Sequence, residues 1–247
     1  MPRYSFIRCI FIRTLLNRIQ AYSAGFLHLF YPHICMHCGS EELSAASVLC
    51  QVCEKNLPYT EFLAIENNKV EKIFWGRTHV QAATSLFFYS QNSMMQALLH
   101  DLKYRGNQAL GIQLGSLLGT ALKNNSRFQV DVLVPVPLHS SKEKSRGFNQ
   151  ATLICQGMAA VTGLTVCTTL LRKNTERSTQ TKKNRAERLE NMVGIFEATP
   201  PDQSKYKNIL LVDDVITTGA TLEACGQALL QAGERKLWIA SVCYSNR

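Results

Sequence analysis

The stretch Ile209-Leu210-Leu211-Val212-Asp213-Asp214-Val215-Ile216-Thr217-Thr218-Gly219-Ala220-Thr221 decides the fold. It begins as a continuous apolar run, which is typical of a strand buried on both faces. Two adjacent carboxylates follow where a core strand tolerates charge least, because an unpaired buried charge is very costly. After a turn rich in Thr and Gly, apolar residues at helical spacing from Leu222 to Leu229 predict a helix. Strand, acidic tip, small-residue loop and helix together predict one unit of an α/β sheet.

The loop after the two acids has the composition of a phosphate-binding loop. Backbone N–H groups and the helix dipole attract an anion, Gly219 lets the backbone approach closely, and Thr hydroxyls donate hydrogen bonds. The candidate phosphate-binding residues are Thr217, Thr218, Gly219, Ala220 and Thr221. Asp213 and Asp214 suit a sugar diol or a hydrated Mg²⁺, whose ligands are oxygens. The alternative is an exposed acidic pair at a strand end, followed by a Thr-rich helix cap.

This loop resembles the phosphoribosyl pyrophosphate (PRPP) motif of type I phosphoribosyltransferases. The resemblance implies that residues 217–221 hold a 5′-phosphate and that Asp213 and Asp214 face the ribose hydroxyls as the candidate catalytic pair. Other strands in the chain alternate with helices, which favours a mostly parallel sheet flanked by helices. Ligands of such sheets bind at the carboxyl ends of the strands.

Length and composition limit the classes of protein to consider. The 247 residues suffice for one large domain and a small module, and 46% hydrophobic residues exclude a mainly disordered chain. A net charge of +9 suits a polyanionic partner such as nucleic acid, a nucleotide or anionic lipid, without choosing among them. Four of the nine cysteines form two Cys-x-x-Cys pairs, and with no secretory signal they favour metal binding over disulfides.

A basic segment, residues 1–30, opens the chain. Its arginines recur too often for a signal-peptide core, and no uncharged run reaches the roughly 20 residues that a membrane span requires. We therefore predict a cytoplasmic protein with no transmembrane segment. A helix touching a membrane surface, a helix packed on the next module, and a loosely ordered tail remain alternatives.

Residues 31–57 are predicted to form a zinc-ribbon-like module. Each Cys-x-x-Cys pair directs two thiolates at one point, and two pairs supply a tetrahedral site for Zn²⁺. The predicted ligands are Cys35, Cys38, Cys50 and Cys53. Four thiolates leave no open position on the metal, so the zinc is predicted to be structural. A redox pair is the alternative for either Cys-x-x-Cys motif taken alone.

After a predicted linker or partial helix at 58–77, residues 78–247 are assigned to the α/β domain. We expect strands near 80–89, 131–137, 165–171, 192–196 and 237–244, with helices near 94–105, 110–121 and 150–161. Lys103 and Arg105, at the break between the first two helices, can reach a phosphate or remain solvated. The basic loop 138–147 is a second candidate anion site, where Arg146 suits a bidentate contact with pyrophosphate.

The segment 172–191 is polar and rich in Lys and Arg, with little apolar periodicity. Mobile loops that close over a charged substrate have this composition, and so do nucleic-acid-binding segments. An ordinary solvated charge run is the third possibility.

Taken together, these motifs resemble the ComF family of bacterial competence and GntX-like proteins with a phosphoribosyltransferase domain. The resemblance runs from about Tyr31 to the end of the chain. It rests on the paired Cys-x-x-Cys motifs, Lys103-Tyr104-Arg105-Gly106, Val134-Pro135-Val136-Pro137-Leu138-His139, Arg146-Gly147-Phe148-Asn149-Gln150, Gln180 with Arg188 and Asn191, and Val212 to Thr221. Lys142 and Lys144 stand where relatives tend to have arginines.

The resemblance implies PRPP with Mg²⁺ as ligand, and a role in natural transformation and uptake of DNA. Displacement of pyrophosphate from C1 of PRPP is the chemistry to expect of an enzyme of this kind, and nothing in the sequence identifies the acceptor. The alternative is a non-catalytic accessory protein whose zinc module and basic segments bind single-stranded DNA or DNA-uptake proteins.

Overall fold

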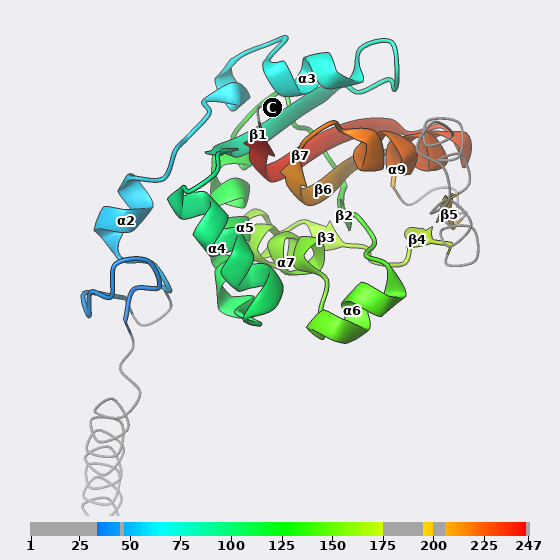
Figure 1. Ribbon diagram of the computed structural model, residues 1–247. Helices are drawn as coiled ribbons and strands as arrows, with labels where there is room; N and C mark the ends of the chain where they lie inside the picture. Colours follow the sequence, from blue (N-terminus) through cyan, green and yellow to red (C-terminus); the bar gives the residue numbers. More distant parts are fainter. Residues whose placement is uncertain (1–33, 45–46, 175–194, 200–205, 246–247) are drawn as a thin grey trace, which may run out of the picture. The chain divides into compact units, whose positions relative to one another are not determined.

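The computed structural model describes residues 34–44, 47–174, 195–199 and 206–245 (Figure 1). The described chain forms two compact units, with the boundary between Lys55 and Asn56. In the described part of the first unit, Gln51–Lys55 form one short helix, α2. The predicted basic segment 1–30 lies outside the described residues, as does 175–191 with Gln180, Arg188 and Asn191.

A five-stranded sheet forms the centre of the second unit, with the strand order β1-β7-β6-β2-β3 and every neighbouring pair parallel. In that order the strands are β1 (Ala82–Tyr89), β7 (Lys236–Ser245), β6 (Asn208–Ile216), β2 (Val132–Pro135) and β3 (Thr165–Val166). The prediction of a mostly parallel sheet is therefore confirmed. Because the strands are parallel, their carboxyl ends lie along one edge.

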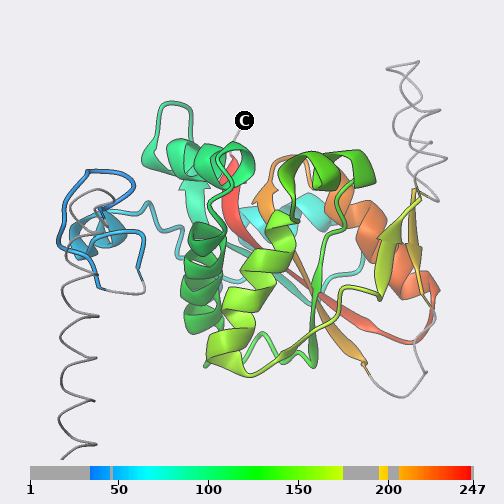
Figure 2. The same ribbon diagram turned by 90° about the horizontal axis from the view of Figure 1, so that it is seen from below.

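Helices cover both faces of this sheet (Figures 1 and 2). One face carries α4 (Met94–Tyr104), α5 (Gln108–Leu122) and α7 (Gln150–Thr162), and the other carries α3 (Lys69–Phe74) and α9 (Ala220–Gln231). Helices α5 and α7 lie in backbone contact, since a Cβ on Gly115 would lie 2.1 Å from the carbonyl oxygen of Ile154.

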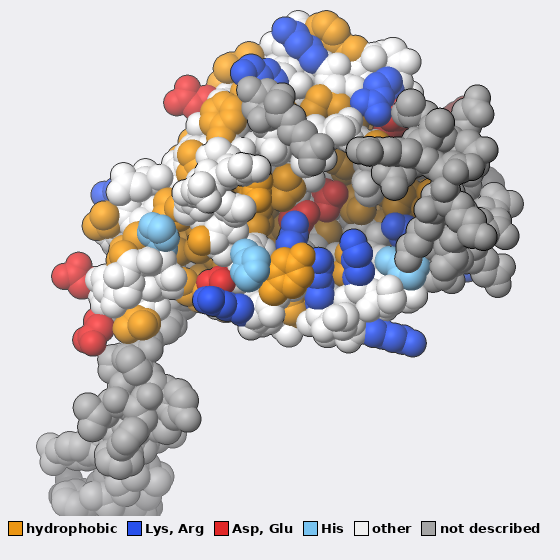
Figure 3. Space-filling view, viewed as in Figure 1, with side chains coloured by type: hydrophobic (Ala, Val, Ile, Leu, Met, Phe, Trp, Pro, Cys, Tyr) orange, Lys and Arg blue, Asp and Glu red, His pale blue; other side chains and the backbone are white. Residues whose placement is uncertain are grey.

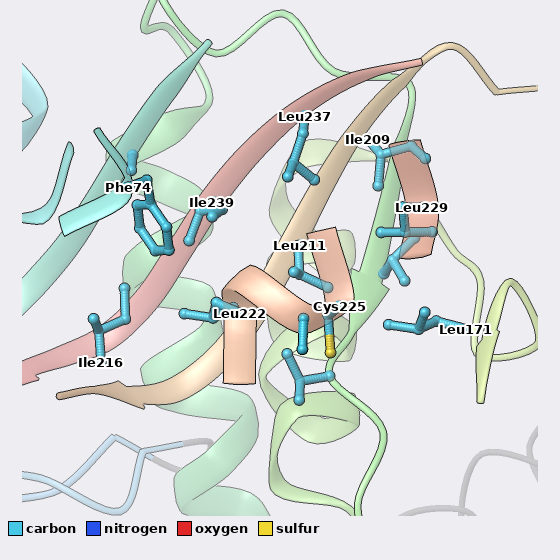
Figure 4. Close-up of a cluster of buried hydrophobic side chains, with 14 of the residues drawn as sticks. Phe74, Leu171, Ile209, Leu211, Ile216, Leu222, Cys225, Leu229, Leu237 and Ile239 are labelled. Atoms are coloured by element: carbon cyan, nitrogen blue, oxygen red, sulfur yellow. The ribbon is translucent and has the colours of Figure 1, made fainter. Parts of the chain in front are cut away.

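The core between α9, α3 and the sheet is built from alternate residues of the central strands (Figure 4). Ile209 and Leu211 of β6 point to this face, and Leu222 and Cys225 of α9 meet them. All four are at most 1% exposed. This packing fixes the start of α9 beside the carboxyl end of β6.

The segment 58–77, expected to be a linker or a partial helix, contains a helix and contributes to the core of the second unit. It contains the 3₁₀ turn η1 (Phe62–Ala64) and α3, whose N-cap Asn68 accepts hydrogen bonds from the N–H groups of Val70 and Glu71. Phe74 is 1% exposed and belongs to the core described above. The sequence underestimated this segment because α3 has only six residues, too few for a helical period to stand out.

The prediction of a basic loop at 138–147 is wrong in part, because Ser140–Arg146 form helix α6. His139 caps it by accepting a hydrogen bond from Ser141 N–H, and Gly147 ends it with φ 79°. The helix buries no residue, so it has no apolar periodicity that a sequence could reveal. Two strands also differ: β3 ends at Val166, and β4 (Leu171–Lys173) pairs antiparallel with β5 (Phe196–Ala198) in a separate sheet.

Candidate functional site

The two acids lie inside β6, and the strand continues past them to Ile216. On one side, Asp213 is opposite Ser241 of β7. On the other side, β2 ends at Pro135, opposite Val212. The acids therefore stand beside the end of a neighbouring strand, where their side chains reach the carboxyl edge of the sheet. This placement explains how two carboxylates are accommodated within an otherwise buried strand.

Each acid has a different environment. Lys103 Nζ lies 2.7 Å from Asp214 Oδ2, and the two side chains are 25% and 15% exposed. Asp213 Oδ1 accepts a hydrogen bond of 2.8 Å from the N–H of Asp214. Burial raises the pKa of Asp213 well above its usual value, and the negative charge of Asp214 adds to this, while the Asp214 N–H and Lys103 oppose it. Asp214 is thus paired, and Asp213 resists ionisation.

The acids line a cavity of about 450 Å³ at the carboxyl edge of the sheet. Figure 3 shows acidic side chains in a hollow of this surface, with Lys, Arg and His side chains below them. Five of the predicted site residues line the cavity: Lys103, Arg146, Asp213, Asp214 and Thr221. Residues from three regions far apart in the sequence thus meet in one place: the end of α4, the end of α6, and the unit formed by β6 and the start of α9.

The remaining loop residues, Thr217, Thr218, Gly219 and Ala220, are not among those that line this cavity. They connect β6 to α9, and Gly219 is the helix N-cap with φ 73°. No side chain of the described residues caps this end of α9. The first N–H groups of a helix need an acceptor, so this end of α9 can accept an anion.

Arg146 is held at the rim by two contacts. Its Nη1 donates a 2.8 Å hydrogen bond to Gln150 Oε1, and its guanidinium lies 5.4 Å from the ring centroid of Tyr104. Gln150 itself is 3% exposed and lines the cavity. These contacts orient the guanidinium beside the cavity without neutralising its charge.

Other basic residues complete the lining; two of them belong to the segment 138–147 predicted as an anion site, although the sequence named only Arg146 there. These additional residues are His139, Lys142 and Lys173. Burial lowers the pKa of Lys173, and the positive charge of Lys142 acts in the same direction. Lys173 ends β4, and only its place in a run of charged residues hinted at a role. The ammonium groups of Lys142 and Lys173, with Lys103 and Arg146, make the cavity suited to a polyanion.

Replacing Asp213 with asparagine is expected to stabilise the protein. At a pH between the ordinary pKa of aspartate and the raised pKa of Asp213, the folded state binds more protons than the unfolded state. The free energy of unfolding of the wild type therefore falls as pH rises through this range. The gain in stability of Asp213→Asn over the wild type should therefore grow above about pH 4 and then level off. Each kcal/mol of this gain raises Tm by about 2–4 °C. Thermal unfolding between pH 5 and 9 measures it; a variant less stable than wild type at pH 8 would contradict the assignment.

The first unit contains the four predicted metal ligands in one cluster. The Sγ atoms of Cys35, Cys38, Cys50 and Cys53 all lie within 4.8 Å of one another, and all four are free thiols. Cys38 Sγ and Cys50 Sγ are 3.6 Å apart, close to the ~3.8 Å edge of a tetrahedron with Zn–S bonds of about 2.3 Å. The cluster can therefore hold a metal such as zinc.

Backbone donors favour the thiolate form at one of these ligands. Burial works to raise the pKa of Cys35, but N–H groups of Cys38, Cys50 and His37, with the Cys38 thiol, lower it to about 6. The Cys50 N–H donates to Cys35 Sγ at 3.3 Å. N–H groups directed at sulfur are typical support for metal-bound thiolates.

Several known proteins are similar to this chain along much of its length. The competence protein ComFC of Bacillus subtilis is 28% identical over 230 residues, which cover 92% of this chain and 90% of the relative. The competence protein F of Haemophilus influenzae is 24% identical over 85% of this chain and 83% of its own length. The DNA utilization protein YhgH of Salmonella typhimurium is 29% identical over 60% of this chain and 66% of its own.

Other comparisons add less. No protein-family model matches the chain. The structure of glutamine PRPP amidotransferase from Bacillus subtilis, complexed with ADP and GMP, aligns with a TM-score of 0.38 and 20% identity, over 53% of this chain and 25% of that one. A likeness this low says nothing about the ligand. Among the helices of the described residues, none combines the length and apolar character needed to cross a bilayer.

Proposed function

From the likeness to competence proteins along most of the chain and from the parallel sheet with helices on both faces, we infer that the chain is a ComF-family protein with a phosphoribosyltransferase-like fold, and we propose that its cavity binds PRPP or a related phosphorylated sugar. One observation carries the proposal: two acids and several cations share one cavity beside an uncapped helix N-terminus. The acids suit hydroxyl groups, and the cations and helix N-terminus suit phosphates. A ligand with both kinds of group matches the whole set.

Within this proposal, residues 217–221 hold the 5′-phosphate, and Asp213 and Asp214 accept hydrogen bonds from the ribose hydroxyls. Arg146 and Lys103 lie toward the pyrophosphate end, where Lys142 and Lys173 add positive charge. Lys103 already pairs with Asp214, so ligand hydroxyls share that carboxylate with an ammonium group. Mg²⁺ is proposed to enter with the ligand, where it would offset the negative charge of the pyrophosphate.

The proposed chemistry, if an acceptor is bound, is displacement of pyrophosphate from C1 of the ribose. The contribution of this chain would be to hold the sugar in place and to stabilise the negative charge that develops on the leaving pyrophosphate.

The zinc proposed at the four cysteines is structural, because four thiolates fill its coordination sphere. The free thiols of the described residues support a cytoplasmic location.

The names of the relatives, competence proteins and DNA utilization proteins, support a role for this binding in handling incoming DNA. The second candidate is therefore a non-catalytic accessory protein that uses the sugar phosphate as a ligand and binds DNA or uptake proteins. Pyrophosphate release from PRPP with any purine or pyrimidine acceptor favours the enzyme. Its absence, with DNA affinity that falls steeply with salt, favours the accessory protein.

The proposal is tested by calorimetric titration of Mg²⁺-PRPP into wild type and Asp213→Asn. We expect the variant to bind at least about tenfold more weakly, because the NH2 group of asparagine, which cannot accept a hydrogen bond, replaces a carboxyl oxygen that accepts one from a ribose hydroxyl. Glu143→Gln is the matched control, since Glu143 is an exposed acid on α6 that does not line the cavity. Equal affinities for wild type and Asp213→Asn would remove Asp213 from the proposed site.

A further inference from the structure

Arg77, in the connection between α3 and β1, joins the loop after β6 to its surroundings. Its Nη1 donates hydrogen bonds of 3.1 Å to Ile73 O and 3.0 Å to Thr218 O. Its Nη2 forms an ion pair with Glu223 in the first turn of α9. One guanidinium thus holds three points: the end of α3, the loop and the start of α9.

Side chains at the end of α3 also pack against the loop after β6, beside Gly219. A Cβ added to Gly219 would lie 2.5 Å from Ile73 Cγ2 and 3.2 Å from Phe74 Cε1. Phe74 is 1% exposed and cannot move aside without disturbing the core. The loop therefore lies between α3 on one side and the first turn of α9 on the other, with its conformation determined by both.

The hydrogen bond to Thr218 O has a consequence for the next N–H group. The C=O and N–H of a trans peptide point in opposite directions, and the described chain contains no cis peptide. With the carbonyl of Thr218 directed at Arg77, the N–H of Gly219 points away from Arg77. Among the described residues, this N–H donates to no backbone or side-chain acceptor.

We propose that Arg77 is a positioning residue for the phosphate-binding loop: by holding the Thr218 carbonyl, it aims the Gly219 N–H at the phosphate. The inference rests on the proposed function, because it names the residue that orients the same site. Arg77 itself is not the phosphate ligand, since Glu223 neutralises its charge and it does not line the cavity of the acids. Its effect is therefore confined to the 5′-phosphate end of the ligand.

The test compares Arg77→Met with Arg127→Met. Arg127 is a matched control, because its Nη1 donates to a backbone carbonyl, Ile65 O at 3.1 Å, and its Nη2 pairs with Glu71, without touching the loop. Calorimetry with ribose 5-phosphate and with inorganic pyrophosphate separates the two ends of the site. We expect Arg77→Met to weaken ribose 5-phosphate binding about tenfold and to leave pyrophosphate binding unchanged. Arg127→Met should change neither.

Hydrogen exchange at Glu223, whose N–H donates a 2.8 Å hydrogen bond to Gly219 O, is measured without ligand and makes the test independent of the ligand. We expect exchange there to speed up about tenfold in Arg77→Met and to stay unchanged in Arg127→Met, because a broken hydrogen bond frees the loop. Unchanged exchange in Arg77→Met, or equal losses in both variants, would overturn the positioning role. If wild type binds no sugar phosphate while Arg77→Met still loosens the loop, the proposed function fails and the structural role of Arg77 remains.

Discussion

Replacing Gly219 with alanine is expected to abolish detectable binding of phosphorylated sugars and to destabilise the second unit. The residue has φ 73°, a conformation that strains an L side chain by about 1–2 kcal/mol. The new Cβ would also meet Ile73 Cγ2 at 2.5 Å, and overpacking of this kind costs about 1–3 kcal/mol. The loop must move to relieve the backbone strain and the overlap with Ile73. This movement displaces the N–H groups that are proposed to bind phosphate. Calorimetry with ribose 5-phosphate and thermal unfolding measure the two effects.

Gly163→Ala separates strain from displacement. Gly163 ends α7 with φ 76°, but a Cβ there would meet no atom within 4 Å. This variant should lose a similar amount of stability from strain alone and keep its affinity for ribose 5-phosphate. Gly219→Ala that binds as tightly as Gly163→Ala would show that the loop conformation is not required for binding.

Removing the metal from the four-cysteine cluster is expected to unfold residues 34–55 and leave the second unit folded. The described part of the first unit buries few apolar residues besides the cysteines, chiefly Leu49. Structural zinc contributes on the order of 10–16 kcal/mol of binding free energy in small modules, and that energy becomes folding energy. Hydrogen exchange with and without a chelator measures it, since protection at 34–55 should vanish while protection of β6 and β7 persists.

Cys50→Ser should reproduce the effect of the chelator, because it removes one of the four ligands. Cys167→Ser is the matched control, since Cys167 is a partly buried free thiol in the second unit and not a member of the cluster. Protection at 34–55 that survives in Cys50→Ser would mean that the module folds without metal.

The β6–α9 unit was predictable because every position in it carries a local signal. A continuous apolar run, two acids, a Gly-containing turn and an amphipathic helix follow one another with no contribution from distant residues. The four-cysteine cluster was predictable for the same reason, since each Cys-x-x-Cys pair is local. The structure differs chiefly in detail, as β6 extends through the acids to Ile216.

Long-range contacts were not predictable. The bond between Arg77 and Thr218 joins residues 141 positions apart, and no pattern around Arg77 indicates it. Lys173 enters the cavity only because β4 and β5 pair, and β5 follows a segment with no apolar periodicity. Helix α6 was missed because it buries nothing and is stabilised by its caps, His139 and Gly147.

The most direct measurement of the central claim is a crystal structure of the protein grown with PRPP and Mg²⁺. We expect the 5′-phosphate at the N–H groups of residues 217–221, the ribose hydroxyls at Asp213 and Asp214, and the pyrophosphate toward Arg146 and Lys103. A ligand bound elsewhere, or a cavity that stays empty at millimolar PRPP, would contradict the account.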